Sequence, residues 1–337
     1  MRLKSALRRG VAAAVIAGIV VSSGIPAYAG IWNIADGDIT VKGASDESGN
    51  YNEVKQGDNE FKKDEGETVI TGESDKNTVT IDTSEGNVDV TFDDLKINVS
   101  GKTEVDGSGK TEVDGSGKTE GDSSGDGSGH GGKAAVTVRG NHDATIELDG
   151  DNELKSGGYK AGLEKNGDES SGKLTIKDDK GKDGSLTAEG GDGGAGIGGG
   201  KESTGSNITI RGGTIEAVGG SNAAGIGDGA GRASGDTDDP NPGHLYICGD
   251  AEVTAKAGSQ TADAKAPAIG GKYGEIPTEN LSDDEHKVTG GRLTRLNADG
   301  TVMEGMGYDY TSVPTPQPDD DDDDDDAPPP KSEAKRS

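Results

Sequence analysis

The feature that most constrains the fold of this chain is an internal repeat with uneven spacing. Each repeat has a short alternating strand, a second such strand and a small-residue turn ending in Ile-Gly, in segments that begin at Lys173, Asn207 and His244. Matching isoleucines lie 34 and 37 residues apart in the first strand, and 29 and 43 residues apart in the turn. Strands that keep their pattern while the loops change length are typical of a parallel β-helix, whose insertions bulge out at the corners of stacked coils.

The alternation inside each repeat predicts which side chains face the core. Ile208 and Ile210 would face inward and Thr209 and Arg211 outward, because successive side chains of a strand point to opposite faces. The stretch GGDGGAGIGGG, residues 190–200, has eight glycines in eleven positions. Glycine suits a corner where the chain turns with positive φ and where coils stack too closely for side chains. We therefore interpret this stretch as a stacked corner and a thin strand.

Looser period-two apolar pairs extend the pattern toward the N-terminus, so the chain is predicted to be all-β. Hydrophobic residues make up only 28% of it, which alone would favour disorder, and the fold prediction therefore depends on the repeat. An octapeptide repeat and a tail with eight consecutive aspartates have almost nothing to bury and are expected to be disordered. The predicted parts are a signal peptide at 1–29, N-terminal β-helix coils at 30–100, a low-complexity insert at 101–132, glycine-rich β-helix repeats at 133–309 and a tail at 310–337.

The N-terminus and the charge indicate a secreted, extracellular or surface-associated protein. Four basic residues precede an apolar run at 11–21, and Ala27-Tyr28-Ala29 is a small-x-small cleavage signal. The apolar run is shorter than the roughly 20 residues of a membrane span, and no transmembrane segment is expected after cleavage. Cleavage would change the formal charge from −29 to about −33, since four cations are lost. Nucleic acid and anionic lipid are therefore poor partners.

The segments SGGYKAGLEKN, GSLTAEGGDGGAGIGGG and NITIRGGTIEAVGGSNAAGIGDG resemble a family of secreted Gram-positive surface proteins built from glycine-rich β-helix repeats. Proteins of this type are commonly labelled carbohydrate-binding domain proteins. The resemblance covers residues 36–271 apart from the insert, and DGDITV, NTVTID and NVDVTFDDLKINVSG look like the family's opening coils. It implies a right-handed parallel β-helix and glycan binding, and the wider β-helix group includes calcium-dependent polysaccharide lyases. The resemblance carries over no site residue.

Few residues suggest chemistry. The four histidines are scattered without zinc-site spacing, and the single cysteine lacks a plausible set of catalytic partners, so we predict no catalytic residue. The acidic loop GDTDDPNPG offers Asp236, Asp238 and Asp239 as candidate calcium ligands, because calcium prefers carboxylate oxygens. A hydrophilic corner loop explains the same residues.

Aromatic faces and one thiol are the remaining candidates. Glycan binding usually needs flat aromatic rings with a few orienting polar groups, and Tyr159, Tyr246 and Tyr273 are the candidates, with Tyr246 facing outward by register. Cys248 is the only cysteine, so no internal disulfide forms. Its outward register predicts that it could join two chains in a disulfide dimer.

The sequence thus predicts a non-catalytic surface or matrix protein that binds extracellular or cell-wall polysaccharide, with calcium as a candidate cofactor. One alternative is a structural spacer or adhesin without sugar specificity. A calcium-dependent polysaccharide lyase is the other, for which Lys177 and Arg211 could stack into a basic stripe on successive coils. We interpret that pair as a solubilising ladder.

Overall fold

The computed structural model describes residues 30–47, 49–64, 66–101, 132–205, 207–231, 244–260, 266–271, 274–275, 286–305 and 307–309. This part of the chain is all-β, with one short 3-10 helix, η1 (Ile34–Asp36). None of its helical residues forms a segment long and apolar enough to cross a membrane. The predicted signal peptide and tail, and the insert from residue 102 to 131, lie outside the described residues.

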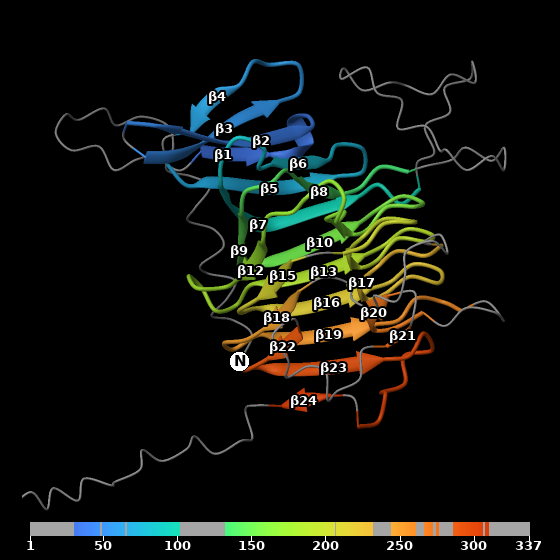
Figure 1. Ribbon diagram of the computed structural model, residues 1–337. Helices are drawn as coiled ribbons and strands as arrows, with labels where there is room; N and C mark the ends of the chain where they lie inside the picture. The colour runs from blue at the N-terminus through green and yellow to red at the C-terminus, as the bar shows by residue number, and fades with distance from the viewer. Residues whose placement is uncertain are drawn as a thin grey trace, which may run out of the picture.

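Three stacks of parallel strands form the body of the molecule (Figure 1). The first stack contains β2 (Ile39–Asp46), β6 (Val79–Asp82), β8 (Val136–Arg139), β11 (Leu163–Glu164), β14 (Ile197–Gly198), β17 (Ile226–Gly227) and β20 (Ile269–Gly271). The second contains the first half of β7 (Val88–Asn98), then β9 (Ala144–Asp149), β12 (Leu174–Lys177), β15 (Ile208–Ile210), β18 (Leu245–Ile247) and β22 (His286–Val288). The third contains the second half of β7, then β10 (Asp151–Lys155), β13 (Ser185–Glu189), β16 (Thr214–Val218), β19 (Glu252–Lys256) and β23 (Arg292–Leu296).

The second and third stacks belong to one curled sheet. β7 pairs with β9 through its first half and with β10 through its second half, while β5 (Thr68–Ser74) pairs with both halves on its other side. Each later coil adds one strand to the second stack, one to the third stack and one to the first stack. This curled parallel arrangement is consistent with the β-solenoid expected from the repeat.

The core is formed by apolar side chains that stack from coil to coil. The isoleucines that the sequence aligned are direct neighbours in the stacks: Ile176, Ile210 and Ile247 in the second, and Ile197, Ile226 and Ile269 in the first. Each of these side chains is at most 1% exposed. Full burial of one such side chain contributes roughly 1.5–3 kcal/mol, so the ladder is a main source of stability. The predicted inward and outward alternation is confirmed here.

Glycine is required at one corner of the coils by the closeness of the backbones. A Cβ atom added at Gly191, Gly220 or Gly258 would lie 1.8, 1.7 or 1.6 Å from a carbonyl oxygen of the preceding coil. The oxygens belong to Gly157, Gly191 and Gly220, so the three contacts form one ladder. No side chain fits at these distances, and this confirms the stacked corner predicted for residues 190–200.

Antiparallel strands lie at both ends of the stacks (Figure 1). At the N-terminal end, β3 (Gly49–Gln56) pairs with β2, β4 (Lys62–Asp64) pairs with β3, and β1 (Gly30–Asn33) lies parallel to β5. At the other end, β21 (Gly274–Glu275) pairs with β20 and β24 (Tyr308–Asp309) with β23. The sequence predicted regular coils from residue 30. The structure differs from this prediction because β2 and β3 form an antiparallel hairpin at the N-terminal end. Such added strands protect sheet edges from pairing with other chains.

A buried ion pair lies in the last coil of the third stack. The inward position occupied by Ala188, Ala217 and Ala255 in successive coils is taken there by Arg295, which is 0% exposed. Its Nη1 lies 2.7 Å from Oε1 of Glu275. Burial raises the pKa of Glu275 above its ordinary value, although the attraction of Arg295 opposes this change. The core therefore ends in a charged pair, which is costly to break once it is buried.

Candidate functional site

An open groove of about 690 Å³ runs along the outer face of the second stack. Its floor is formed by the outward side chains of β7, β9 and β12 and by Arg211, which follows β15. Its wall comes from the N-terminal hairpin and from the residues before β5. Its lining residues are Asn50, Tyr51, Asn52, Gly66, Glu67, Asn87, Asp89, Val90, Thr91, Asp143, Thr145, Glu147, Lys173, Thr175, Lys177, Lys180 and Arg211.

The floor consists of two rows of side chains that the strand register fixes. In one row Asp89, Thr145 and Thr175 are neighbours, and the row continues beyond the groove through Thr209 and Tyr246. The second row starts two residues later on each strand. It contains Thr91, Glu147, Lys177 and Arg211. Because neighbouring parallel strands lie ~4.8 Å apart, the rows present polar groups at a regular spacing.

The wall is held against the floor by one buried amide. Nδ2 of Asn52 donates to Oγ1 of Thr68 at 2.8 Å and to the carbonyl oxygen of Asp89 at 2.6 Å. These bonds join the hairpin to β5 and β7, so the wall has a fixed position. Tyr51 lies beside Asn52 on β3 and also lines the groove. The ammonium group of Lys63 lies 4.1 Å from the centroid of the Tyr51 ring. The groove thus combines one aromatic ring with amide and hydroxyl groups.

Three ion pairs lie within the groove. Lys177 Nζ lies 3.1 Å from Glu147, and Lys173 Nζ lies 3.6 Å from Asp143. Lys177 also pairs, at 2.8 Å, with Asp179, which lies outside the groove lining. The third pair joins Lys180 to Glu67. Burial favours a higher pKa for Glu67, but hydrogen bonds from Lys180 and Thr91 outweigh it, and the pKa lies below its ordinary value. The lowered pKa favours the ionised form of Glu67, which pairs with Lys180 at the edge of the groove.

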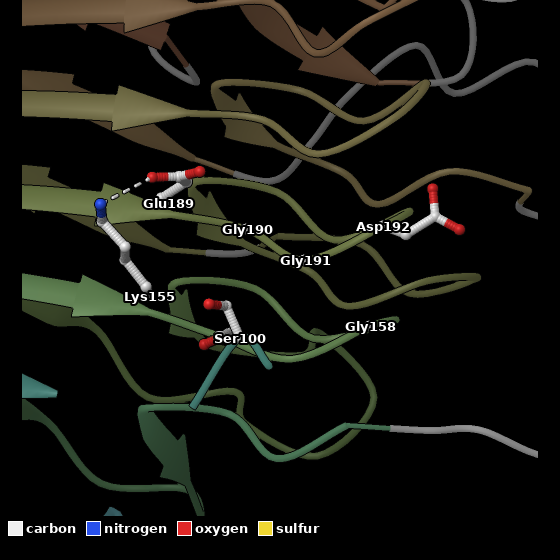
Figure 2. A pocket seen from close by; sticks show the side chains of 8 residues that line it. Ser100, Lys155, Gly158, Glu189, Gly190, Gly191 and Asp192 are labelled. Atoms are coloured by element: carbon white, nitrogen blue, oxygen red, sulfur yellow. Dashed lines mark ion pairs between the residues drawn. The ribbon is translucent and has the colours of Figure 1, made fainter. Parts of the chain in front are cut away.

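A second, smaller pocket of about 300 Å³ lies at the corner that follows the third stack (Figure 2). Gly158, Gly190 and Gly191 form much of it, and Figure 2 shows Lys155 paired with Glu189 beside them. Nζ of Lys155 and Oε2 of Glu189 are 3.5 Å apart. Lys155 also pairs with Glu153 at 3.0 Å, and this hydrogen bond is the main cause of a raised pKa for Lys155. The charge of Lys155 is already paired with Glu153 and Glu189, and few other side chains line this pocket. It therefore offers fewer binding groups to a ligand than the groove does.

The sequence-predicted tyrosines do not come together in the described structure. Tyr246 faces outward as expected, one strand beyond the end of the groove. Tyr159 lies in a turn after β10 with φ +70°, and the ammonium group of Lys201 is 4.1 Å from its ring centroid. Tyr273 lies outside the described residues, as do the calcium candidates Asp236, Asp238 and Asp239. Cys248 is half-buried and free, and the disulfide dimer stays a prediction.

The basic stripe that the lyase alternative would use is compensated at Lys177. Lys177 and Arg211 are on the same face of successive coils, but Glu147 and Asp179 neutralise Lys177. The sequence reasoning missed the wall residues Tyr51 and Asn52, because they approach the floor only through the N-terminal hairpin. The one available signal was the outward row that contains Lys177 and Arg211, since it marked the face over which the hairpin folds.

Two buried charged residues lie away from the groove, at the end of β11 and directly after it. Glu164 is 2% exposed and accepts hydrogen bonds from Ala161 N at 3.1 Å and Lys160 Nζ at 3.3 Å, yet burial raises its pKa. Lys165 is 0% exposed, and its Nζ donates to the carbonyl oxygen of Ser170 at 3.0 Å. Burial lowers the pKa of Lys165 to about 8. No sequence pattern indicated that these two charges would be inside.

Within the described ranges, no group of three or more His, Cys, Asp and Glu side chains is arranged to hold a metal ion. Comparisons with models of protein families, with curated proteins and with solved structures found no match to this chain.

Proposed function

We propose that the chain is a secreted, non-catalytic surface or matrix protein that binds carbohydrate, with the glycan seated in the groove of the second stack. The observation that carries this proposal is the position of the Tyr51 ring beside amide and hydroxyl groups in an open groove of about 690 Å³. A sugar ring packs its apolar face on an aromatic ring and donates and accepts hydrogen bonds at its edge, so this set of groups is complementary to it. The strand rows extend along the stack, and an extended chain of sugar units matches that direction.

We propose that the fold is a right-handed parallel β-helix. We also propose that the chain is related to the secreted surface proteins with glycine-rich β-helix repeats that it resembles. Both proposals are supported by the parallel stacks and the glycine corner. The right-handed sense also agrees with the strong preference of parallel β-crossover connections for that hand.

The charge state of Lys177 supports a binding role over a lyase. The hydrogen bond to Asp179, with a further one to Glu147, raises the pKa of Lys177. An ammonium group held in this way keeps its proton and is a poor general base, whereas proton abstraction needs a base poised near the working pH. The spacer or adhesin without sugar specificity remains the alternative that the binding experiment tests.

The experiment is affinity electrophoresis of residues 30–337 in gels that contain one glycan or polysaccharide at a time, with calcium and again with chelator. We expect retention by one glycan class. Retention that the chelator removes would support the calcium proposal for Asp236, Asp238 and Asp239. If no glycan retains the protein in either buffer, the result would contradict the proposed function and favour the spacer.

A matched pair of variants locates the site. Tyr51→Ala removes the ring in the groove and should weaken retention by about tenfold, which corresponds to roughly 1.4 kcal/mol. Tyr159→Ala removes the ring of a corner tyrosine outside the groove and should leave retention unchanged. Equal melting temperatures of both variants and the parent chain show that the fold is intact. Undiminished retention of Tyr51→Ala would place the glycan elsewhere.

A further inference from the structure

The charges of the groove are balanced in a chain that is strongly acidic overall. The whole sequence has 63 acidic residues and 34 basic ones. The groove instead combines four acidic side chains with four basic ones: Glu67, Asp89, Asp143 and Glu147, and Lys173, Lys177, Lys180 and Arg211. A binding surface for a simple cation or a simple polyanion would carry one sign of charge. The groove carries both.

Six of these eight charges neutralise one another in the three ion pairs described above. The other two are Asp89 and Arg211, both exposed. Within the residues that the structure covers, neither side chain makes a hydrogen bond or an ion pair, and Asp179 acts on Arg211 only by longer-range attraction. Among the described residues, the groove thus has one carboxylate and one guanidinium group without a direct hydrogen-bond or ion-pair partner.

These two groups lie at opposite ends of the floor. Asp89 is on β7, and Arg211 follows β15, which is three strands further along the second stack. Three strand spacings of ~4.8 Å place them about 14 Å apart along the stack. Thr145 and Thr175 occupy the floor between them, in the row of Asp89. A carboxylate attracts a protonated amine, and a guanidinium group binds an acid group through two parallel hydrogen bonds.

We infer that the groove recognises a zwitterionic polysaccharide, with a protonated amine of the glycan at Asp89 and an acid group at Arg211. This inference rests on the proposed carbohydrate-binding function and names its ligand class. The amine side of such a ligand offsets the repulsion that a purely anionic glycan meets from this acidic chain. The acid side provides the partner that a purely cationic glycan lacks at Arg211.

The test uses one polysaccharide backbone in four charge states. De-N-acetylated hyaluronan carries both amines and carboxylates, hyaluronan carries only carboxylates, the methyl ester of the deacetylated polymer carries only amines, and the methyl ester of hyaluronan carries neither. Binding of each to residues 30–337 is measured by titration calorimetry at slightly acidic pH, where the amines are protonated. We expect the zwitterionic form to bind at least about tenfold more tightly than the other three, which is one decade in dissociation constant.

Two variants assign the two ends, with controls on the neighbouring face. Asp89→Asn should bind the zwitterionic and the carboxylate-only forms alike, and Arg211→Gln should bind the zwitterionic and the amine-only forms alike. Glu216→Gln and Lys96→Gln change exposed charges on the third stack, outside the groove, and should keep the preference of the parent chain.

The outcomes separate this inference from the proposed function. Equal binding of all four forms by the parent chain, or no binding of the zwitterionic form, overturns the inference. The glycan electrophoresis of the parent chain tests the proposed function, and Tyr51→Ala tests its location, both independently of these charges. A preference that persists unchanged in both Asp89→Asn and Arg211→Gln also overturns the assignment of the two ends.

Discussion

Replacing Lys165 by methionine should remove a pH-dependent part of the stability of the fold. Lys165 is fully buried, and burial lowers its pKa from the ordinary value of 10.5 to about 8, against a weaker attraction from Asp143. The unfolded chain therefore binds the proton more tightly than the folded chain. Stability rises wherever the unfolded state binds more protons, so the contribution of Lys165 increases from about pH 8 to pH 10.5 and is constant below pH 8.

The magnitude follows from the two pKa values. One pKa unit is worth about 1.36 kcal/mol, so the interval from about 8 to 10.5 corresponds to roughly 3 kcal/mol. Lys165→Met keeps the length of the side chain but cannot titrate. It also loses the hydrogen bond to Ser170, worth about 1 kcal/mol, but this loss is nearly the same at every pH.

The assay is urea denaturation of the parent chain and of Lys165→Met at a series of pH values across this interval. The free energy of unfolding of the parent, minus that of the variant, should rise by roughly 3 kcal/mol from the acidic to the alkaline end. Tyrosines and other lysines titrate in both proteins, so the subtraction removes their shared contribution. Parallel curves across the interval would refute the reasoning, because they would show that the ammonium group is not desolvated in the folded chain.

Three further predictions concern the coils and the thiol. Gly220→Ala places a Cβ against a carbonyl oxygen 1.7 Å away and should lower the melting temperature clearly, whereas Gly101→Ala, with nothing within 4 Å, should leave it unchanged; equal effects would contradict the close-stacking argument. Ile210→Ala removes a fully buried side chain from the ladder and should cost about 2–5 kcal/mol in urea denaturation, and a loss below 1 kcal/mol would show that the coil collapses around the gap. Under oxidising conditions the parent chain should yield a dimer on non-reducing gels that Cys248→Ser lacks, and a parent chain that stays monomeric would rule out the disulfide.

The regular part of the fold could be predicted because its signal is local and repeated. The alternation around Ile210 identifies its face, and the alignment of Ile176 with Ile247 identifies its neighbours, so register between coils follows from the sequence alone. Gly191 was likewise predictable as a corner, because a glycine follows the second strand at the matching position of each repeat, at Gly191, Gly220 and Gly258. These residues obey the same rule in every coil.

The groove was harder to predict because it depends on contacts that occur once. Tyr51 reaches the floor only because β3 turns back on β2 in an antiparallel pair, and no repeat in the sequence marks that pairing. The pairing of Lys177 with Glu147 depends on the register between β9 and β12 and on two side-chain conformations. Lys165 was not expected inside, since a lysine is seldom fully buried.

The antiparallel hairpin at the N-terminal end has a mechanical consequence. Asn52 joins this hairpin to β5 and β7, and the groove that it completes extends to Arg211. Hydrogen bonds between coils run along the stack. A force that pulls the two ends of the molecule apart therefore acts on the junctions between coils in series. A polymer bound along the groove would span several of these junctions at once and share that load. A bound ligand would then strengthen the junctions between the first coils. The force needed to unfold these coils would depend on whether the groove is occupied.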